Sequence, residues 1–358
     1  MEPTGVYTVL GGMSGTSLDG LDLAMCRFEH RRNETVSWRY DVLAAETLAY
    51  SAQWQQHLAH AQHLSGLELT ALDRHFGRFL GHEGALFIER HRLPKPDLYV
   101  SHGHTVFHVP EGGFTLQIGA VSEVSATAGC AVLGDLRSGD VALGGQGAPL
   151  VPIGDRLLFA EYDACVNIGG FANLSLERDG RRVAWDVCAA NGVLNLLAQR
   201  ADERLQYDKN GALARSGHVV EDVLHRLEKL GYYQRQSPKS LGREFTEAEI
   251  LPLLEVNCAP ADLLRTYTEH IALRLCADLG AVRGKVLFTG GGTHNDFLLE
   301  RISALARFEV VKPNDRLIDF KEAIVFAFLG ALWLNGDHNV LSSVTGAKHD
   351  HRSGIYRL

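Results

Sequence analysis

Small and polar residues near the start of the chain form a cluster suited to binding phosphate. The cluster is Gly11-Gly-Met-Ser-Gly-Thr-Ser-Leu-Asp-Gly-Leu-Asp22, and it follows the apolar run Val6–Leu10 and leads into Leu21–Cys26. This pattern predicts a strand, a tight turn and a second strand, with glycines that let backbone N–H groups approach an anion. Hydroxyl donors, and a carboxylate able to hold Mg²⁺ directly or through water, come from Ser14, Thr16, Ser17 and Asp19.

The predicted hairpin differs from two common phosphate-binding loops. It lacks the Gly-Lys-Ser/Thr of a Walker loop, and a strand follows it where a Rossmann turn would be followed by a helix. The residues predicted to contact nucleotide phosphates are Gly15, Thr16, Ser17, Leu18, Asp19, Gly20, Leu21 and Asp22. An ordinary glycine-serine hairpin loop is the alternative interpretation.

Two further glycine-rich turns occur later in the chain. Gly169 and Gly170 lie between two predicted strands, and Gly290, Gly291 and Gly292 lie between a predicted strand and a helix. The second arrangement lets a ligand approach the backbone, and the helix N-terminus favours negative charge. Each turn alone is a weak signal, but the three together predict nucleotide binding. Two hairpin turns and one strand–helix turn are arranged as in the actin-like ATPase fold.

The elements that must position these turns alternate between strands and helices, which predicts a mixed sheet in an α/β protein. The predicted strands are Val6–Leu10, Leu21–Cys26, Glu34–Leu48, Asp97–Ser101, Thr115–Ile118, Ala131–Leu133, Ala164–Ile168, Phe171–Leu176, Arg181–Val187 and Lys285–Phe288. The predicted helical segments are Ala52–Arg92, Ala120–Ala128, Asn295–Leu305 and Lys321–Leu334. Because the middle of the chain partly repeats the opening hairpin, we expect two domains, residues 1–134 with 336–358 and residues 135–335.

Composition narrows the class of protein. The 358 residues are 46% hydrophobic and 22% charged, with a net charge of −8 and no basic stripe, so nucleic acid is not an expected partner. The longest apolar run, Ala323–Leu334, is too short to cross a bilayer, and the N-terminus does not read as a signal peptide. Six cysteines without a C-x-x-C pair predict reduced thiols and therefore a cytoplasmic protein.

Several motifs in one order carry a resemblance to a known family. They are Met13–Asp22, Ser101-His-Gly-His-Thr105, Gly134-Asp-Leu-Arg-Ser-Gly-Asp140, Gly144-Gly-Gln-Gly-Ala-Pro-Leu-Val-Pro152, Asn167-Ile-Gly-Gly-Phe-Ala-Asn173, Thr289-Gly-Gly-Gly292 and Lys321-Glu-Ala323. With these motifs the chain resembles the anhydro-N-acetylmuramic acid kinases, which are sugar kinases of the actin-like superfamily. The motifs cover nearly the whole chain, and the glycine-rich string from Gly144 to Pro152 is the hardest to reach by chance.

The resemblance implies a fold and a reaction. The fold is a two-domain actin-like (ribonuclease H-like) ATPase with an interdomain cleft. The reaction uses ATP, with Mg²⁺, and water to open the 1,6-anhydro bridge of anhydro-N-acetylmuramic acid and to phosphorylate O6. The product is N-acetylmuramic acid 6-phosphate, in the recycling of peptidoglycan. The resemblance also implies a homodimer whose partners are small molecules.

The resemblance further assigns roles to individual residues. It implies that Asp186, near the end of a predicted strand, is the base that takes a proton from the attacking water. Taken alone, an aspartate at a strand end is more often a turn or capping residue. The substrate-binding residues that it implies are Ser14, His102, His104, Thr105, Gln117, Arg137 and Glu322. The Arg137 guanidinium suits the lactyl carboxylate of a muramic acid, although an interdomain salt bridge is an alternative for it and for Asp140.

Two of these assignments have alternatives from the residues themselves. His102 and His104 form an H-x-H pair with His108 beyond, a pattern that also occurs in metal sites. Glu322, which the predicted elements place at a helix start, either orients water around magnesium or complements the helix dipole.

One segment departs from the family pattern. Most members follow the catalytic aspartate with Thr-Gly-Pro-Gly-Asn, whereas this chain has Val187-Cys-Ala-Ala-Asn191. Because the glycines are gone, positive φ angles cost more here, and we expect a changed loop shape with an effect on rate or substrate. Two alternatives follow. One is another actin-like sugar kinase, such as an N-acetylhexosamine kinase, and the other is a catalytically silent relative that binds sugar or nucleotide.

Overall fold

The computed structural model describes residues 5–15, 18–31, 37–237 and 239–358. The chain divides into two compact units, unit 1 with residues 1–160 and 320–358 and unit 2 with residues 161–319. The domain boundaries expected from the sequence lie at different residues. The structure groups residues 135–160 and 320–335 with unit 1, whereas the sequence predicts both segments in the second domain.

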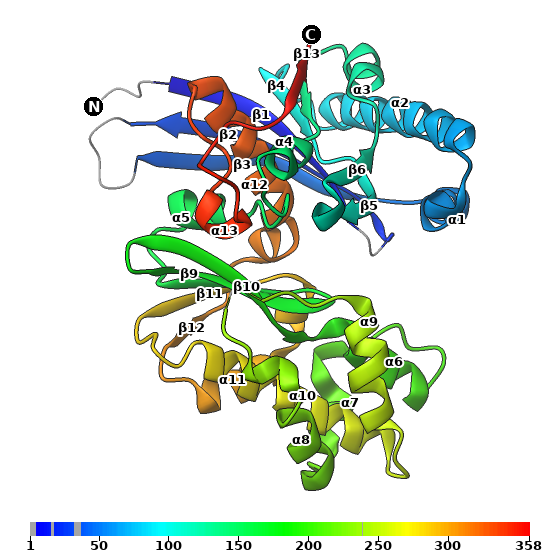
Figure 1. Ribbon diagram of the computed structural model, residues 1–358, viewed down its shortest axis with the longest axis vertical. Helices are drawn as coiled ribbons and strands as arrows, with labels where there is room; N and C mark the ends of the chain where they lie inside the picture. Colours follow the sequence, from blue (N-terminus) through cyan, green and yellow to red (C-terminus); the bar gives the residue numbers. More distant parts are fainter. Residues whose placement is uncertain (1–4, 16–17, 32–36, 238) are drawn as a thin grey trace. The chain divides into compact units, whose positions relative to one another are not determined.

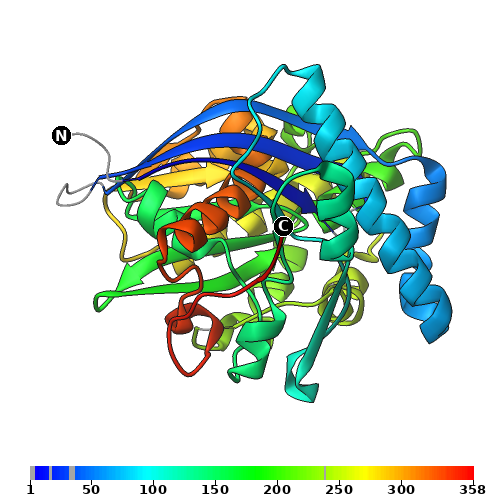
Figure 2. The ribbon, with the colours of Figure 1, turned by 90° about the horizontal axis from the view of Figure 1, so that it is seen from above.

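Unit 1 contains a mixed sheet and a separate hairpin. Its strands are β1 (Gly5–Ser14), β2 (Gly20–His30), β3 (Trp38–Ala49), β4 (Leu98–Ser101), β5 (His104–Val109), β6 (Phe114–Ile118), β7 (Val132–Gly134) and β13 (Ile355–Arg357). The sheet order is β13-β7-β4-β1-β2-β3, with β1, β2 and β3 antiparallel and β4 and β7 parallel to β1. Figures 1 and 2 show β1–β3 as long blue arrows side by side. β5 and β6 pair only with each other.

Helices cover both faces of this sheet. They are α1 (Ala52–His60), α2 (Gly66–Arg90), α3 (Val121–Ala128), α4 (Ser138–Ala142), α5 (Pro152–Leu158), α13 (Ser342–Thr345) and most of α12 (Asp315–Asn335). A Cβ atom on Gly11 would lie 2.1 Å from the carbonyl oxygen of Ala323, so glycine lets α12 press against β1. The opposite face, which carries Leu10 and Tyr99, packs in one core cluster with Phe76 and other residues of α2. This contact with β1 explains why residues 320–335 of α12 belong to unit 1.

The predicted helical stretch 52–92 contains two α-helices. α1 ends near His60, and α2 starts after Ser65, whose side chain accepts a hydrogen bond from the backbone N–H of Glu68 while Glu68 bonds back to Ser65. This capping box starts a new helix at a point where the hydrophobic periodicity of the sequence alone predicts one continuous helix.

Unit 2 contains a second mixed sheet. Its strands are β8 (Ala164–Ile168), β9 (Phe171–Arg178), β10 (Arg181–Ala189), β11 (Lys285–Thr289) and β12 (Glu309–Val311), in the order β10-β9-β8-β11-β12. β8, β9 and β10 are antiparallel, and β11 and β12 run parallel to β8. Unit 1 has the same arrangement in its strands β3-β2-β1-β4-β7. The repeat of one topology confirms the predicted α/β class and fits two related halves of an actin-like fold.

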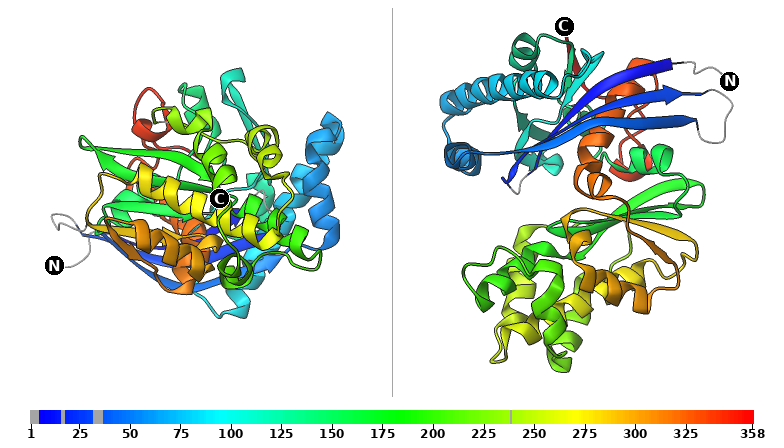
Figure 3. Two further views of the ribbon diagram at one scale, coloured as in Figure 1. Left: turned by 90° about the horizontal axis from the view of Figure 1, so that it is seen from below. Right: turned by 180° about the vertical axis from the view of Figure 1, so that it is seen from behind.

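The helices of unit 2 surround a large apolar core. They are α6 (Asn191–Ala201), α7 (Ala212–Ser216), α8 (Glu221–Glu228), α9 (Arg243–Phe245), α10 (Pro260–Asp278) and α11 (Asp296–Leu305). The long helix α10 packs against α6, α7, α8 and α11 (Figures 1 and 3). Its buried residues, among them Leu264, Tyr267 and Ile271, join the core cluster of the β8–β10 sheet. Within the described residues, no helix is both long and apolar enough to cross a membrane.

Candidate active site

The predicted phosphate hairpin of unit 1 is the turn between β1 and β2. Thr16 and Ser17, two of its predicted phosphate contacts, lie outside the described residues. Leu18 adopts a φ of 61°, and its carbonyl oxygen accepts a hydrogen bond from the Gln55 side chain at 3.1 Å. The Asp19 carbonyl accepts one from the Tyr50 N–H at 3.3 Å. Leu18 and Asp19 are therefore tied to α1 and to the residue that follows β3.

The other residues of this hairpin divide between the sheet and the turn. Gly15 and the exposed Asp19 lie in the turn, while Gly20, Leu21 and Asp22 begin β2. The Leu21 side chain packs into the core, and its backbone is paired with Ser14 and Leu48 in the neighbouring strands. Asp22 accepts a hydrogen bond from the Thr47 hydroxyl at 2.6 Å, a cross-strand pair. Asp19, the residue predicted to hold Mg²⁺, is exposed in the turn.

The donor set at Asp19 fits magnesium rather than a metal held by a full protein cage. Among the described residues, no group of three or more His, Cys, Asp or Glu side chains is close enough to hold a metal ion. Mg²⁺ commonly keeps several waters and binds through one or two carboxylates together with substrate phosphates. A single exposed aspartate beside a glycine-rich turn meets that requirement.

Ser14 and His104 lie together at the end of β1. The Ser14 hydroxyl accepts a hydrogen bond from the Tyr50 hydroxyl at 2.7 Å and lies 3.1 Å from His104 Nδ1. Burial lowers the pKa of His104 to about 4, so its ring is neutral at physiological pH. This chain of polar groups fixes the orientation of the imidazole, as hydrogen bonding to sugar hydroxyls would require.

The buried His102 and the partly buried Arg137 form a pair. Arg137 donates from Nε and Nη2 to His102 Nε2 at 3.1 and 2.9 Å, and from Nη1 to the Gly147 carbonyl at 2.7 Å. Because a guanidinium only donates, His102 Nε2 must accept, and its Nδ1–H donates to the Gly103 carbonyl at 2.8 Å. Both imidazole nitrogens are thus occupied, which argues against the H-x-H metal site. Burial, with a smaller effect of Arg137, lowers the pKa of His102 to about 3.

The hairpin β5–β6, of which only the second strand was predicted, carries the next two substrate residues. Thr105 and Gln117 face each other across the strands, and Gln117 Nε2 donates to the hydroxyls of Thr115 at 2.8 Å and Thr105 at 3.3 Å. Its Oε1 is buried and has no hydrogen-bond partner in the described part of the chain. A buried amide oxygen without a donor is costly, and a ligand N–H or O–H would satisfy it.

Glu322 differs from its predicted place at a helix start. α12 begins at Asp315, so Glu322 lies in the second turn, where the helix dipole has little effect. Its side chain is exposed, and the nearby positive charges of Arg137 and Lys321 both favour the charged form of the carboxyl group. The adjacent Lys321 forms a buried ion pair with Asp155 at 2.7 Å. Glu322 therefore belongs electrostatically with Arg137, and the dipole interpretation loses its basis.

In unit 2, Asp186 occupies a β-bulge near the end of β10. Asp186 pairs with Asn173, but the next pair is Cys188 with Ala172, so Val187 is the extra residue. Bulges bend a strand and redirect its side chains, and they are common beside active sites. Asp186 Oδ2 accepts a hydrogen bond from the Leu241 N–H at 2.9 Å.

The surroundings of Asp186 suit a general base. Burial raises the pKa of its carboxyl group, with a smaller opposing effect of the Leu241 N–H. The Asp186 backbone is held on both sides, because its N–H donates to the Lys239 carbonyl at 3.0 Å and its carbonyl accepts from the Tyr232 hydroxyl at 2.6 Å. A carboxylate with a raised pKa and a fixed backbone is typical of a catalytic base.

The segment that departs from the family pattern avoids the left-handed region, although Ala190 has an unusual backbone conformation with φ −131° and ψ −105°. No residue from Val187 to Asn191 has a positive φ, so alanines replace glycines there without left-handed strain. The N–H groups of Ala190 and Asn191 donate to the carbonyls of Gly170 and Gly169 at 2.8 and 3.0 Å. The segment therefore supports the second glycine turn, and the chain can form this loop without the glycines.

The third glycine turn lies beside the second. A Cβ on Gly290, whose φ is 82°, would lie 2.6 Å from Asn167 Oδ1, and one on Gly292 would lie 2.2 Å from Ile168 Cγ2. Asn191 links the turns, since its side chain donates to the Ile168 carbonyl at 3.3 Å and lies near both Gly291 and Gly292. The turns at 169–170 and 290–292 thus form one surface in unit 2.

Comparison with known proteins shows the family of the chain. A model of the anhydro-N-acetylmuramic acid kinase family matches residues 7–356. The chain belongs to the anhydro-N-acetylmuramic acid kinase family. Curated members include a kinase of this name from Actinobacillus pleuropneumoniae, 31% identical over 97% of each chain, and one from Pseudomonas fluorescens, 35% identical over 95% of this chain and 96% of that one. The family and the enzyme class predicted from the motifs are confirmed.

Solved structures include a more distant likeness. The activator of 2-hydroxyisocaproyl-CoA dehydratase from Clostridium difficile, with bound ADPNP, is 14% identical, covers 92% of this chain and 97% of its own, and has a TM-score of 0.43.

Several residues that support the anhydro-N-acetylmuramic acid kinase site were missed in the sequence. Tyr50 binds Ser14, Tyr232 and Leu241 bind Asp186, and Asn191 joins the two glycine turns of unit 2. Asn191 lies in the departing family motif, a signal that could have identified it. The other three lie outside every motif and are brought in only by long-range packing.

Proposed function

We infer that this protein is an ATP-dependent kinase that opens the 1,6-anhydro bridge of anhydro-N-acetylmuramic acid and phosphorylates O6, giving N-acetylmuramic acid 6-phosphate. Family membership over residues 7–356 is the observation that carries the inference. It is supported by a partly buried carboxylate, Asp186, whose pKa is raised and whose backbone is fixed.

In the proposed reaction, Asp186 takes the proton of a water molecule that attacks C1 of the sugar. The C1–O6 bond breaks, and O6 uses its electron pair to bond to the γ-phosphorus of ATP as ADP leaves. One event thus forms the C1–O and O6–P bonds and breaks the C1–O6 and P–O bonds. A base with a raised pKa accepts the proton more readily than an ordinary aspartate.

The remaining residues bind and orient the substrates in this proposal. Arg137 binds the lactyl carboxylate, and His104, Thr105 and Gln117 bind polar groups of the sugar. The nucleotide phosphates are assigned to the turns at 15–22, 169–170 and 290–292. Asp19 is the residue that would hold Mg²⁺, which neutralises phosphate charge when bound. A homodimer is a further expectation from the family, to be tested by light scattering.

The proposal is tested by incubating the protein with ATP, Mg²⁺ and anhydro-N-acetylmuramic acid and following ADP and the 6-phosphate sugar. We expect turnover by the wild type. Asp186→Asn should lower kcat by roughly 10²–10⁴-fold, since it removes a general base, and should leave nucleotide affinity nearly unchanged. Near wild-type turnover by this variant would remove Asp186 from the base role.

Two other outcomes would replace the proposal. Turnover of N-acetylglucosamine and not of the anhydro sugar would indicate a hexosamine kinase. Binding of the ligands, seen as a rise in Tm, without ADP formation would indicate a catalytically silent relative.

A further inference from the structure

The loop that follows Arg137 folds around a buried carboxylate. Asp140, in α4, is fully buried, and its Oδ2 accepts the Gly147 N–H at 2.7 Å. A Cβ on Gly145 would lie 2.2 Å from that same oxygen, so the carboxylate lies against the backbone of the glycine-rich string. The string Gly144–Gly147 is therefore shaped to enclose Asp140.

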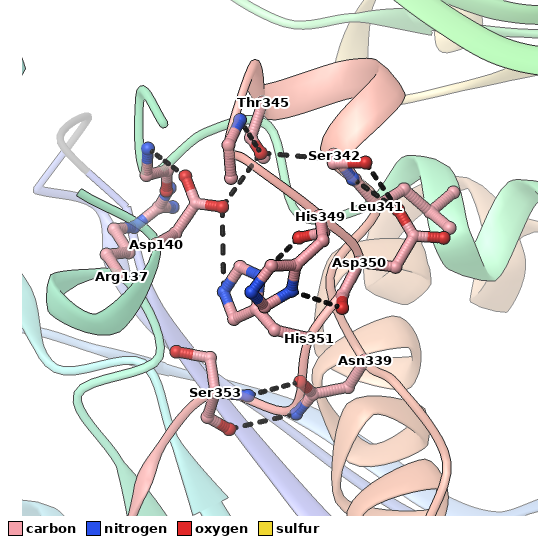
Figure 4. A network of polar contacts seen from close by, with 12 residues as sticks. Arg137, Asp140, Asn339, Leu341, Ser342, Thr345, His349, Asp350, His351 and Ser353 are labelled. Carbon is pink, nitrogen blue, oxygen red and sulfur yellow. Dashed lines mark hydrogen bonds and ion pairs between the residues drawn. The ribbon is translucent and has the colours of Figure 1, made fainter. Parts of the chain in front are cut away.

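The other carboxylate oxygen is held by the C-terminal part of the chain (Figure 4). Thr345, at the end of α13, donates its hydroxyl hydrogen to Asp140 Oδ1 at 2.7 Å, and His351 Nε2 lies 3.6 Å from the same atom. The Thr345 carbonyl also accepts the Gln146 N–H at 2.8 Å. Residues some 200 positions away thus hold the loop at two points.

Gly147 connects this carboxylate to Arg137. Its N–H donates to Asp140, and its carbonyl accepts from Arg137 Nη1. Within the described part of the chain, the hydrogen bonds of Arg137 to Gly147 and His102 use three of its five N–H groups. One N–H on each terminal nitrogen is therefore available to bind a ligand. Two parallel N–H groups match a carboxylate. The direction of that pair depends on where Gly147 holds the guanidinium.

We propose that Asp140 and Thr345 are positioning residues that fix Arg137 for recognition of the substrate's carboxylate, so that the C-terminal segment around α13 takes part in sugar recognition. The inference rests on the proposed function. It explains why Asp140, a buried aspartate with no catalytic role, lies between Arg137 and Gly145 in the sequence. It also explains how Arg137 keeps its orientation before a substrate binds.

The test is steady-state kinetics of full-length variants with anhydro-N-acetylmuramic acid and ATP. Thr345→Val removes the hydroxyl at nearly constant volume, and we expect KM for the sugar to rise about tenfold, with kcat and KM for ATP near wild type. Thr345→Ser, which keeps the hydroxyl, should restore the wild-type KM. Ser342→Ala is the matched control, because Ser342 lies in the same short helix and bonds to Asp350 rather than to Asp140.

A second pair of variants displaces the carboxylate from the other side. Gly145→Ala places a methyl group against Asp140 and should raise KM for the sugar in the same way. Gly144→Ala is the control. Gly144 has a φ of 83°, and a Cβ added there would have no atom within 4 Å, so this variant tests backbone strain alone.

The outcomes separate the two proposals. The positioning role would be overturned if folded Thr345→Val had the wild-type KM for the sugar. If Thr345→Val does not fold, the same result in Gly145→Ala would overturn it. Equal rises of KM for sugar and ATP would overturn it as well, because they indicate general disruption. Absence of turnover in the wild type would instead overturn the proposed function, and the inference with it.

Discussion

At the scale of single residues, the site depends on groups whose protonation is set by burial. His102 is locked as a neutral acceptor by Arg137, with a pKa lowered to about 3. The neutral His102 ring accepts hydrogen bonds that align the Arg137 guanidinium, whereas a protonated His102 ring would repel the guanidinium. Asp186 shows the opposite case, since burial raises the pKa of an acid and keeps its carboxylate reactive toward a proton.

The raised pKa of Asp186 leads to a prediction about pH. The base must be ionised, so kcat/KM should fall as the pH drops through its pKa, at a midpoint above the ordinary value of an aspartate.

In the folded state the ionised form is disfavoured, so Asp186 destabilises the fold at neutral pH, and that penalty disappears as the pH falls through the raised pKa. Asp186→Asn should therefore have a higher Tm than the wild type at neutral pH and no advantage in acid. Thermal melts at both pH values, and a pH–rate profile of the wild type, would check this. A variant less stable at neutral pH would contradict it.

At the scale of elements, the bulge in β10 depends on segments that lie far away in sequence. Lys239 contributes its backbone carbonyl to Asp186, and its ammonium lies 4.8 Å from the ring centroid of Tyr232 and 3.8 Å from Asp278. Trp185, the residue before Asp186, donates to Asp278 at 2.6 Å. Asp186 is thus held by Tyr232, Lys239 and Leu241, and Lys239 also lies close to Asp278 at the end of α10.

We expect Tyr232→Phe to loosen this bulge. It removes the hydroxyl that donates to the Asp186 carbonyl, a bond worth about 1 kcal/mol, and should lower kcat by about three- to tenfold with little change in KM. Tyr233→Phe is the matched control, because the Tyr233 hydroxyl bonds to His270 at 2.9 Å and not to Asp186. Kinetics and Tm of both variants would decide the matter. An equal loss of kcat in the two would show that packing, rather than the bond to Asp186, matters.

At the scale of the whole molecule, both units carry residues assigned to the nucleotide. The hairpin at 15–22 belongs to unit 1, and the turns at 169–170 and 290–292 belong to unit 2. Their common topology, antiparallel strands followed by parallel ones, gives each unit a glycine turn at the same point of its first hairpin.

This assignment predicts how hydrogen exchange should change on binding. A non-hydrolysable ATP analogue with Mg²⁺ should slow amide exchange in peptides covering all three turns, because bound phosphates accept hydrogen bonds from their N–H groups. Asp19→Asn should reduce the protection at a given Mg²⁺ concentration. Mass spectrometry of the peptides would measure it, with the β9–β10 turn around Gly180 as an unprotected reference. Protection confined to one unit would contradict the assignment.

The sequence by itself determined the glycine turns, most of the strands and the family, because these depend on local stereochemistry and on motifs that are read along the chain. It placed Gly169–Gly170 at a hairpin and Gly290–Gly292 between a strand and a helix, and both are found there. Only the tertiary structure decided what surrounds the reactive groups. Tyr50 reaches Ser14, Leu241 reaches Asp186 and Thr345 reaches Asp140 across separations of 36 to 205 residues, and no spacing rule records such contacts. They arise when apolar faces pack and bring remote polar groups into the same low-dielectric interior, where each must find a partner.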